Sequence, residues 1–286
     1  MNVSIIAVTA RMGCFDLLVH CMEQQTFSKD DFEVIVVDSY YNERKDFVKD
    51  RLPKNFRHIG LPEDRPFYDA CYANNVGTRE AQGELLIYFS DCNWAYPDFV
   101  KDHWDIYETV PGYSMTGYVD RFPIPPLKHG ITRSWELDAW SIFEKEFTAD
   151  YARWYFEAIQ STYRERKGQP ETNDGGIIEL PGDKWYGSLN ESIPMQVVKD
   201  CNGWNEAYDG CYGLSDIDLG VRANLAGWKF LIKADSINKK LGQKSESGVI
   251  PASNKPQTRT LDDNWTLFDE MKASGKWRTP DGHGLV

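Results

Sequence analysis

The first part of the chain alternates between short apolar runs and stretches with apolar residues at helical spacing. The apolar, β-branched runs predict buried strands at 3–9, 32–39, 56–61 and 84–91. The helical spacing predicts helices at 14–25 and 68–83. Strands that alternate with helices are typical of a parallel sheet with right-handed crossovers. The pattern therefore predicts an α/β fold, with a mostly parallel central sheet flanked by helices.

The later part of the chain is less regular. We expect a helix at 97–110, a strand at 113–120, a polar loop at 164–176 and a last helix at 264–275. Apolar residues also recur at helical spacing from Trp140 to Lys167. Packing of this stripe against the sheet is the simpler interpretation, and a cap that binds an acceptor is the alternative. Nothing in the composition marks a domain boundary, so we expect one domain with an elaborated second half.

The composition narrows the class of protein. The chain has 286 residues, 41% of them hydrophobic, which is enough for a packed core. Its formal net charge of −12 disfavours nucleic acid as a partner, because phosphate backbones bind clustered Lys and Arg. The six cysteines show no CxxC pair and no metal-ligand spacing, which indicates reduced thiols. Because no apolar run has the length of a transmembrane segment and no signal peptide is visible, we expect a soluble, cytoplasmic protein.

Polar side chains stand at the ends of three predicted strands. Thr9, Asp38 and Asp91 all fall where ligands bind in parallel sheets, beyond the carboxyl ends of the strands. Asp91 supplies a carboxylate and Asn93 a neutral oxygen, which together can bind a divalent cation that neutralises a diphosphate. The alternative is that these polar groups only solvate loops, since Asp-x-Asn turns are common at strand ends.

A second polar motif opens a predicted helix that ends at Gly227. Ser215 or Asp216 is well placed to cap this helix, where the helix dipole stabilises a carboxylate. The same dipole keeps Asp216 ionised, which suits a general base. We expect Asp218 to orient Arg222, four residues on, or to cap the helix.

The chain resembles the family-2 inverting nucleotide-sugar glycosyltransferases of the GT-A fold. The likeness covers most of residues 1–232 in the expected order, and its last block is similar to the galactosyltransferase-like version of the C-terminal half. Four blocks carry it: VSIIAVTAR, FEVIVVDS, ACYANNVGTREAQGELLIYFSDCNWAYPDF and GSLNESIPMQVVKDCNGWNEAYDGCYGLSDIDLGVRANLAGW. The resemblance implies a Rossmann-like central sheet in a single domain with elaborations on the acceptor side.

The resemblance also implies roles for individual residues. The residues expected to bind the donor are Thr9, Arg11, Asp38, Asn75 and Asp91. Those expected on the acceptor side are Tyr212, which would form an aromatic floor under the sugar, with Gly213, Trp204 and Asn190. Asp216 would be the base that deprotonates the acceptor hydroxyl. A divalent cation, Mn²⁺ or Mg²⁺, would bind Asp91 and Asn93, with His283 as a late ligand.

Three positions depart from the family pattern. The metal-binding Asp-x-Asp is replaced by Ser90-Asp91-Cys92-Asn93, and an ungapped alignment places Ser90 and Cys92 at the two aspartate positions. Asn74 stands where an arginine often precedes the family's Asn-x-Gly, and Ser215 replaces the glutamate of its Glu-Asp pair. A neutral second ligand weakens cation binding, so metal dependence stays open.

The expected organisation is a GT-A domain over 1–241 and a tail with one helix over 242–286. Residues 1–110 would bind the nucleotide sugar and 111–241 the acceptor. The expected activity is transfer of a sugar, with inversion, from a UDP-linked donor to a carbohydrate or other hydroxyl acceptor. A non-catalytic sugar- or nucleotide-binding protein is the alternative. A nucleotidyltransferase ranks last, because residues 9–13 show only a faint version of a glycine-rich phosphate loop.

Overall fold

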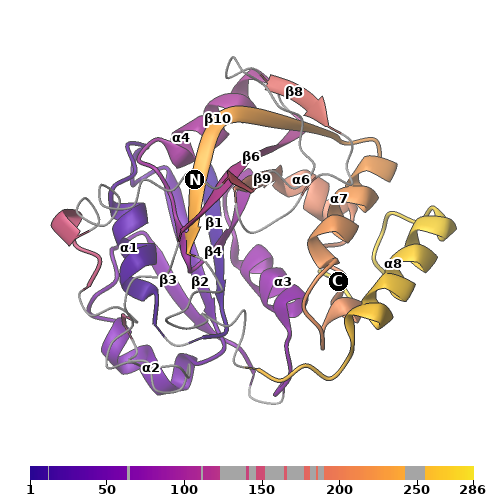
Figure 1. The fold of residues 1–286 in the computed structure, drawn as a ribbon, viewed down its shortest axis with the longest axis horizontal. Helices are drawn as coiled ribbons and strands as arrows, with labels where there is room; N and C mark the ends of the chain where they lie inside the picture. Colours follow the sequence, from indigo (N-terminus) through magenta and orange to yellow (C-terminus); the bar gives the residue numbers. More distant parts are fainter. Residues whose placement is uncertain are drawn as a thin grey trace.

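The computed structural model describes most of the chain in detail. The described residues are 1–11, 13–62, 65–110, 112–122, 140–141, 146–151, 164–165, 177–180, 185, 190–241 and 255–286. The following statements concern these residues. They form one α/β domain around a single mixed sheet in which the longest pairings are parallel (Figure 1).

The N-terminal half of the sheet is parallel, as the sequence predicts. Four strands lie in the order β3-β2-β1-β4, with bounds Phe56–Gly60, Phe32–Asp38, Val3–Thr9 and Leu85–Ser90. Continuous β-branched runs suit these strands because helices cover both of their faces. The register pairs Thr9 with Asp38 at the carboxyl ends of β1 and β2. The two polar residues therefore reach the same edge of the sheet.

The other half of the sheet is mixed and was largely not predicted. The short strand β9 (Glu191–Pro194) lies antiparallel between β4 and β6 (Tyr113–Phe122), and β6 pairs in parallel with β10 (Lys229–Leu241). Three further short strands add to these, β5 (Asn93–Trp94), β7 (Arg164–Glu165) and β8 (Ile177–Leu180). The predicted strand at 113–120 is confirmed in β6. Within the predicted loop at 164–176, the described residues 164–165 form β7, and 166–176 lie outside the described residues.

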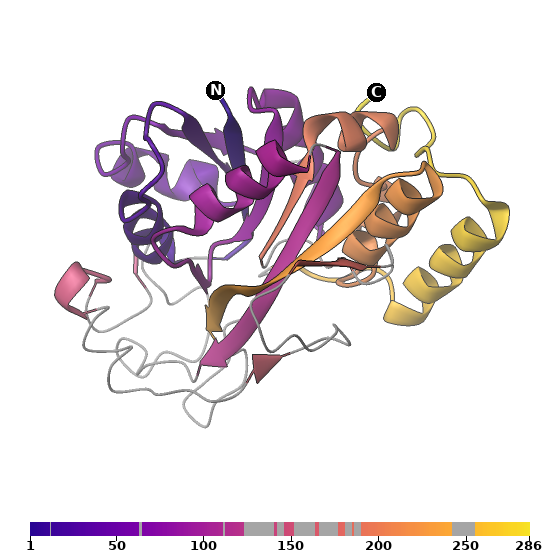
Figure 2. The same cartoon turned by 90° about the horizontal axis from the view of Figure 1, so that it is seen from above.

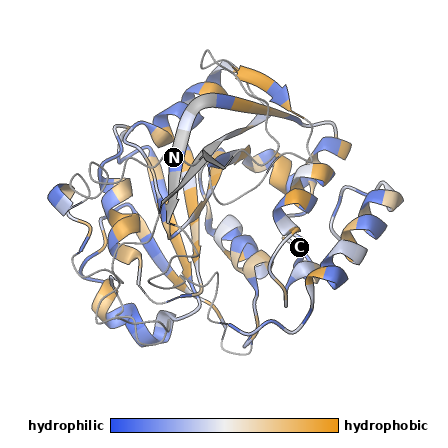
Figure 3. Ribbon diagram, in the orientation of Figure 1, coloured by the Kyte–Doolittle hydropathy of each residue, from blue (hydrophilic) through white to orange (hydrophobic). Residues whose placement is uncertain are grey.

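Helices cover both faces of the sheet (Figure 2). One apolar cluster joins alternate residues of β1 and β4 to α1 (Phe15–Glu23) and α4 (Phe99–Thr109). On the opposite face, a second cluster joins Ile6 and Leu86 to α6 (Met195–Asp200) and α7 (Ser215–Leu225). The helix α3 (Ala70–Glu80) packs on β1 and β2 on that same side. Figure 3 shows the mixture of apolar and polar residues that lets each helix face both the sheet and solvent.

Two further helices complete the described fold, α2 (Tyr41–Val48) beside β3 and α8 (Leu261–Ser274) outside α7 (Figure 1). The helix α2 was not predicted, because its sequence is mostly polar. The last helix, α8, starts three residues earlier than predicted, since Thr260 and Asp263 form a capping box. It lies beside α7 (Figure 1), and its Phe268 is buried in the second apolar cluster.

The described part of the 140–167 pattern supports packing. Trp140 and Phe147 are buried in the cluster around α1, and the Trp140 ring stacks on Phe15 with centroids 6.2 Å apart. Apart from 140–141, 146–151 and 164–165, the rest of that pattern lies outside the described residues. All six cysteines are buried and free of disulfides. In the described part of the chain, no helix is long and apolar enough to cross a membrane.

Candidate active site

A buried ion pair lies at the carboxyl ends of β1 and β4. Thr9 Oγ1 donates a 2.6 Å hydrogen bond to Asp91 Oδ2, and Arg11 Nε lies 3.2 Å from Asp91 Oδ1. Burial lowers the pKa of Arg11, but the charge of Asp91 and other neighbours outweighs burial and raises the pKa above its ordinary value. The structure thus brings three predicted donor-binding residues together, with the guanidinium charged and placed on the carboxylate.

Asp38 is held by a second buried cluster. Its two oxygens accept 2.6 Å hydrogen bonds from the guanidinium of Arg44 in α2, and His58 Nε2 lies 2.7 Å from Oδ2. Burial raises the pKa of Asp38, but His58 and Arg44 outweigh burial and lower the pKa below its ordinary value. Because Asp38 is fully buried, we revise its predicted donor contact to a positioning role. It fixes the start of α2 and the strand ends.

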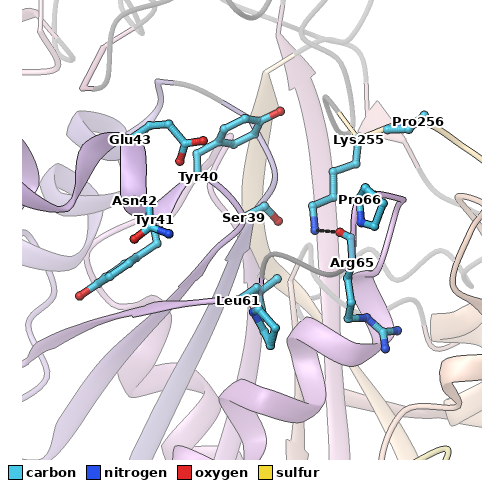
Figure 4. Close-up of a pocket in the computed structure, with 11 residues that line it drawn as sticks. Ser39, Tyr40, Tyr41, Asn42, Glu43, Leu61, Arg65, Pro66, Lys255 and Pro256 are labelled. Carbon is cyan, nitrogen blue, oxygen red and sulfur yellow. Dashed lines mark hydrogen bonds between the residues drawn. The ribbon is translucent and has the colours of Figure 1, made fainter.

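A cavity opens beside Asp38, at the carboxyl ends of β2 and β3. Its volume is about 330 Å³, at the lower end of the range of small-molecule sites. Figure 4 shows two groups of residues that face each other across it. The lining residues labelled on one side are Ser39, Tyr40, Tyr41, Asn42, Glu43 and Leu61, and those on the other are Arg65, Pro66, Lys255 and Pro256. Pro62 also lines the cavity. Sequence reasoning named none of them, although Ser39 directly follows the predicted strand-end aspartate.

The C-terminal segment completes this cavity. Lys255 Nζ donates to the carbonyl oxygen of Arg65 at 2.9 Å (Figure 4). It also donates to Asp69 Oδ2 at 2.8 Å. The amide of Tyr68 donates to the carbonyl of Pro256 at 3.0 Å. Residues from the expected tail therefore form one wall of the site.

Two predicted ligand-binding residues bond to each other inside the protein. Asn75 Nδ2 donates to the carbonyl of Trp204 at 2.9 Å, and the amide of Trp204 donates to Asn75 Oδ1 at 2.8 Å. The Trp204 side chain is buried against the rings of Tyr88 and Trp185. We therefore revise the predicted donor contact of Asn75 and the predicted acceptor contact of Trp204. They join α3 to the loop that leads into the site.

Asn190 is also placed in the interior rather than on the acceptor side. Its Oδ1 lies 3.1 Å from His103 Nε2, and its Nδ2 donates to the carbonyl of Ser236 at 3.0 Å. Burial lowers the pKa of His103 to about 4, which keeps the imidazole neutral at pH 7. These hydrogen bonds tie α4 to the second half of the sheet. The predicted acceptor role of Asn190 is replaced by a structural one.

The start of α7 differs from the predicted cap. The N-cap residue is Leu214, with a left-handed φ of 72°, and Gly213 before it has φ of 110°. Asp216 lies in the first turn, half-buried, with Oδ1 accepting the amide of Ile217 at 2.9 Å. A sharp turn of the backbone, rather than a Ser215 or Asp216 side chain, therefore begins the helix. Glycine suits position 213 because its φ of 110° lies well beyond the left-handed region that an L-residue such as Leu214 can adopt.

The predicted pairing of Asp218 is confirmed. Arg222 Nε donates to Asp218 Oδ2 at 2.7 Å, and Tyr208 donates its hydroxyl to Oδ1 at 3.1 Å. Arg222 also donates to the carbonyls of Cys201 and Gly203. Asp218 is fully buried, so it holds the fold around α7 and is not available as a base.

Tyr68 lies beside the turn before α7, where its carbonyl accepts the amide of Gly210 at 2.6 Å. Burial raises its pKa, and so do several neighbours, including Tyr212, Asp209 and Asp216. Tyr68 in turn is one of the groups that raise the pKa of Arg11. Sequence reasoning missed Tyr68.

Tyr212 presents an exposed ring beside Tyr68. Its exposed fraction is 49%, and the two rings meet edge to face with centroids 6.1 Å apart. An exposed aromatic ring beside a half-buried carboxylate is suited to contact a sugar. The ring of Tyr212 is therefore open to a ligand, and the acceptor role of Tyr212 and Gly213 stays a prediction.

Asp209 is a second residue that sequence reasoning missed. Its carboxylate accepts the amides of Cys71 and Tyr72 at 2.9 and 3.2 Å, and Arg65 donates to it at 3.0 Å. A carboxylate that accepts these first amides complements the helix dipole of α3. Burial nevertheless raises its pKa to about 7. The sequence around Asp209 contains no motif that predicts its contact with the amides of Cys71 and Tyr72, because those residues lie far away in the chain.

The last helix fastens the turn that carries Tyr212. The buried side chain of Asn264 in α8 donates to the carbonyl of Gly213 at 3.0 Å. The amide of Thr258 donates to the carbonyl of Gly210 at 2.8 Å. These contacts join the C-terminal segment to the loop between Tyr208 and α7.

The three predicted metal ligands are not brought together. The amide of His283 donates to Pro280, and its carbonyl accepts the amide of Glu206 at 2.9 Å. The next residue, Gly284, accepts a 2.7 Å hydrogen bond from Arg79 in the last turn of α3. Asp209 accepts amides in the first turn of α3, so it lies at the opposite end of this helix, the end that faces the site. Hence His283 lies away from Asp91.

Asp91 itself is already engaged by its own chain. One carboxylate oxygen accepts from Thr9 and the other faces Arg11. Within the described ranges, no three His, Cys, Asp or Glu side chains gather as a metal site. The donor set around Asp91 therefore does not fit a divalent cation.

Comparisons of this chain with known sequences and solved structures identify its fold. No protein-family profile and no curated protein sequence matches the chain. A structure of S. aureus TarS 1-349 in complex with UDP-GlcNAc is similar, with a TM-score of 0.61 at 13% identity over 96% of this chain and 66% of that one. A structure of S. aureus TarS 1-349 in complex with UDP gives a TM-score of 0.56 at 13% identity, over 96% of this chain and 65% of that one.

A third structure, of S. aureus TarS, gives a TM-score of 0.54 at 14% identity and covers 85% of this chain. The present chain spans 37% to 66% of these TarS chains. At this identity the likeness shows the fold. It confirms the GT-A fold that the sequence predicts.

Proposed function

We propose that this protein transfers a sugar from a UDP-sugar to an acceptor hydroxyl with inversion, and that Asp216 is the general base. The observation that carries this proposal is the placement of Asp216. It is half-buried in the first turn of α7, four residues after Tyr212, whose exposed ring meets Tyr68 edge to face. The choice of UDP is supported by the similar TarS structures, which are complexes with UDP-GlcNAc and UDP.

The donor would bind along the carboxyl edge of the parallel strands. The cavity of about 330 Å³ beside Ser39 would hold the nucleoside. From there the diphosphate would run toward the ends of β1 and β4, where Arg11 carries a positive charge. The sugar would then lie between this ion pair and Asp216, over the exposed ring of Tyr212.

The reaction requires one proton acceptor and one stabilised leaving group. Asp216 takes the proton of the acceptor hydroxyl while that oxygen attacks the anomeric carbon, through an oxocarbenium-like transition state. The bond from the anomeric carbon to the diphosphate oxygen breaks, and its electron pair stays on the diphosphate. The position of Asp216 in the first turn of α7 favours its ionised form, because the helix dipole stabilises negative charge there.

A second candidate function is binding of a nucleotide sugar without transfer. The observation that favours it is the internal engagement of both strand-end carboxylates, Asp38 by Arg44 and His58, and Asp91 by Thr9 and Arg11. Such a protein would retain UDP affinity but would leave the donor intact.

Release of UDP separates these two functions. A panel of UDP-sugars would be incubated with the wild type, with Asp216→Asn and with Asp269→Asn, an exposed control in α8. The proposal predicts UDP release from at least one donor, a rate reduced about a hundredfold or more in Asp216→Asn, and no change in Asp269→Asn. Binding of UDP without any release would support the second function instead.

A further inference from the structure

The Arg11–Asp91 pair lies where the family resemblance predicts a divalent cation. The carboxylate is 2% exposed, and the Arg11 side chain is 8% exposed. A cation that bound Asp91 would have to displace both Arg11 and the hydroxyl of Thr9. Breaking a buried pair in this way leaves an uncompensated charge in the interior, which is strongly unfavourable.

The neighbouring side chains do not replace the lost ligands. The Cys92 thiol lies 3.2 Å from the hydroxyl of Ser90, and it is buried within the chain. Ser90, at the end of β4, takes the other aspartate position of the family motif, and its hydroxyl is neutral. Divalent Mg²⁺ and Mn²⁺ prefer carboxylate and other hard oxygen ligands. One engaged carboxylate beside a thiol is therefore a poor site for them.

The backbone of Arg11 is held at the edge of the nucleoside cavity. Arg44 Nη1 donates to the Arg11 carbonyl at 2.9 Å, and Nε of the same guanidinium donates to Asp38 Oδ2. The amide of Ser39, which lines the cavity, donates to the Thr9 carbonyl at 2.9 Å. These contacts fix the backbone of Arg11 next to Ser39 and Arg44, and so close to the wall of the cavity that Ser39 lines. A diphosphate attached to a nucleoside in the cavity would extend toward Arg11.

We propose that Arg11, oriented by Asp91, is a permanent cation for the donor diphosphate, and that the protein binds UDP and transfers sugar without a divalent metal. This inference rests on the proposed function. A guanidinium stays charged at all physiological pH values and presents five N–H donors, which suit phosphate oxygens. During transfer Arg11 keeps its proton and stabilises the negative charge that the diphosphate gains. Asp91 acts through Arg11 and is a positioning residue.

The first test needs only the wild-type protein. UDP is titrated into the protein by calorimetry, once with EDTA and once with excess Mn²⁺. The inference predicts dissociation constants that agree within about twofold, because Arg11 already supplies the charge. Binding that tightens about tenfold or more with Mn²⁺ would overturn it, since a tenfold change corresponds to a real metal bridge rather than to ionic strength.

The second test removes the cation. In EDTA, Arg11→Gln should weaken UDP binding about tenfold or more and uridine binding less than about threefold, because uridine carries no phosphate. Arg51→Gln, an exposed arginine outside the site, is the matched control and should bind both ligands as the wild type does. Wild-type UDP affinity in a folded Arg11→Gln variant would contradict the inference. Arg11→Lys, which keeps the charge but not the planar fork, is the second variant if Arg11→Gln does not fold.

The results distinguish this inference from the proposed function. If UDP fails to bind with EDTA and with Mn²⁺, the proposed function itself is wrong. If UDP binds and turnover occurs only with Mn²⁺, the function stands and the role of Arg11 is wrong.

Discussion

Asp216 and Asp218 lie two residues apart in α7 but occupy opposite environments. The Asp218 carboxylate is fully buried and lies 2.7 Å from Arg222 Nε, whereas Asp216 is half-buried in the first turn. Positions two apart on a helix point in nearly opposite directions, so one acid faces the core and the other is partly exposed to solvent. Asp218 therefore has a structural role, and Asp216 is the candidate base.

Replacement of Asp216 by Asn should remove catalysis while leaving the donor site intact. We expect kcat to fall about a hundred- to ten-thousandfold, the usual contribution of a general base. UDP affinity should stay within about twofold, because Asp216 lies on the acceptor side of the proposed site. Turnover and calorimetric titration on the same preparations measure the two effects. A variant with near-normal kcat would remove Asp216 from this role.

Replacement of Asp218 by Asn should act on stability. The change leaves the buried Arg222 without its carboxylate, which costs about 3–5 kcal/mol in the free energy of unfolding. Asp269→Asn, on the exposed face of α8, should change that free energy by less than about 0.5 kcal/mol. Urea denaturation measures both. Equal stability of the two variants would show that the Asp218–Arg222 pair does not hold α7.

Replacement of Asn264 by Ala should loosen the turn that carries Tyr212. The lost hydrogen bond leaves the partly buried carbonyl of Gly213 to be solvated, at a cost of about 0.5–1.5 kcal/mol in the free energy of unfolding. We also expect a higher KM for the acceptor and an unchanged affinity for UDP. Thr266→Ala, exposed on the same helix, is the control. An acceptor KM that does not move would separate Asn264 from the site.

Asp209 should give the stability a specific pH dependence. Its pKa is raised from 3.8 to about 7 in the folded protein, so the folded state keeps a proton that the unfolded state has already lost between these values. Its contribution to stability is therefore full below the unfolded pKa and is lost as the pH rises through about 7. Relative to Asp209→Asn, the wild type should lose free energy of unfolding over this interval. Parallel curves of urea-derived stability against pH would contradict the prediction.

The parallel half of the fold could be predicted because its signals are local. The runs that form β1, β2 and β4 are continuous and β-branched, and the helices between them carry a clear apolar stripe. The helix α2 escaped prediction because polar side chains fill it, and what holds Arg44 inside is its pairing with Asp38. Such pairing is a tertiary contact with no periodicity in the sequence.

In the candidate site, too, the contacts that follow from local sequence could be predicted, and those between distant segments could not. The meeting of Thr9 and Asp91 follows from neighbouring parallel strands, and the Asp218–Arg222 pair follows from helical spacing. The bonds between Asn75 and Trp204 join positions 129 residues apart, and no local signal distinguishes them from ligand-binding residues. The contributions of Lys255 and Asn264 likewise depend on how the C-terminal segment folds back over the site.

The central claim is best tested by following the anomeric proton of a UDP-sugar by NMR. With an α-linked donor and either an acceptor or water as the attacking hydroxyl, the wild type should consume the donor and release UDP. The first sugar product should have the β configuration, and Asp216→Asn should react at about one hundredth of the wild-type rate or less. A donor that stays intact, a first product with retained configuration, or full activity in Asp216→Asn would contradict the account.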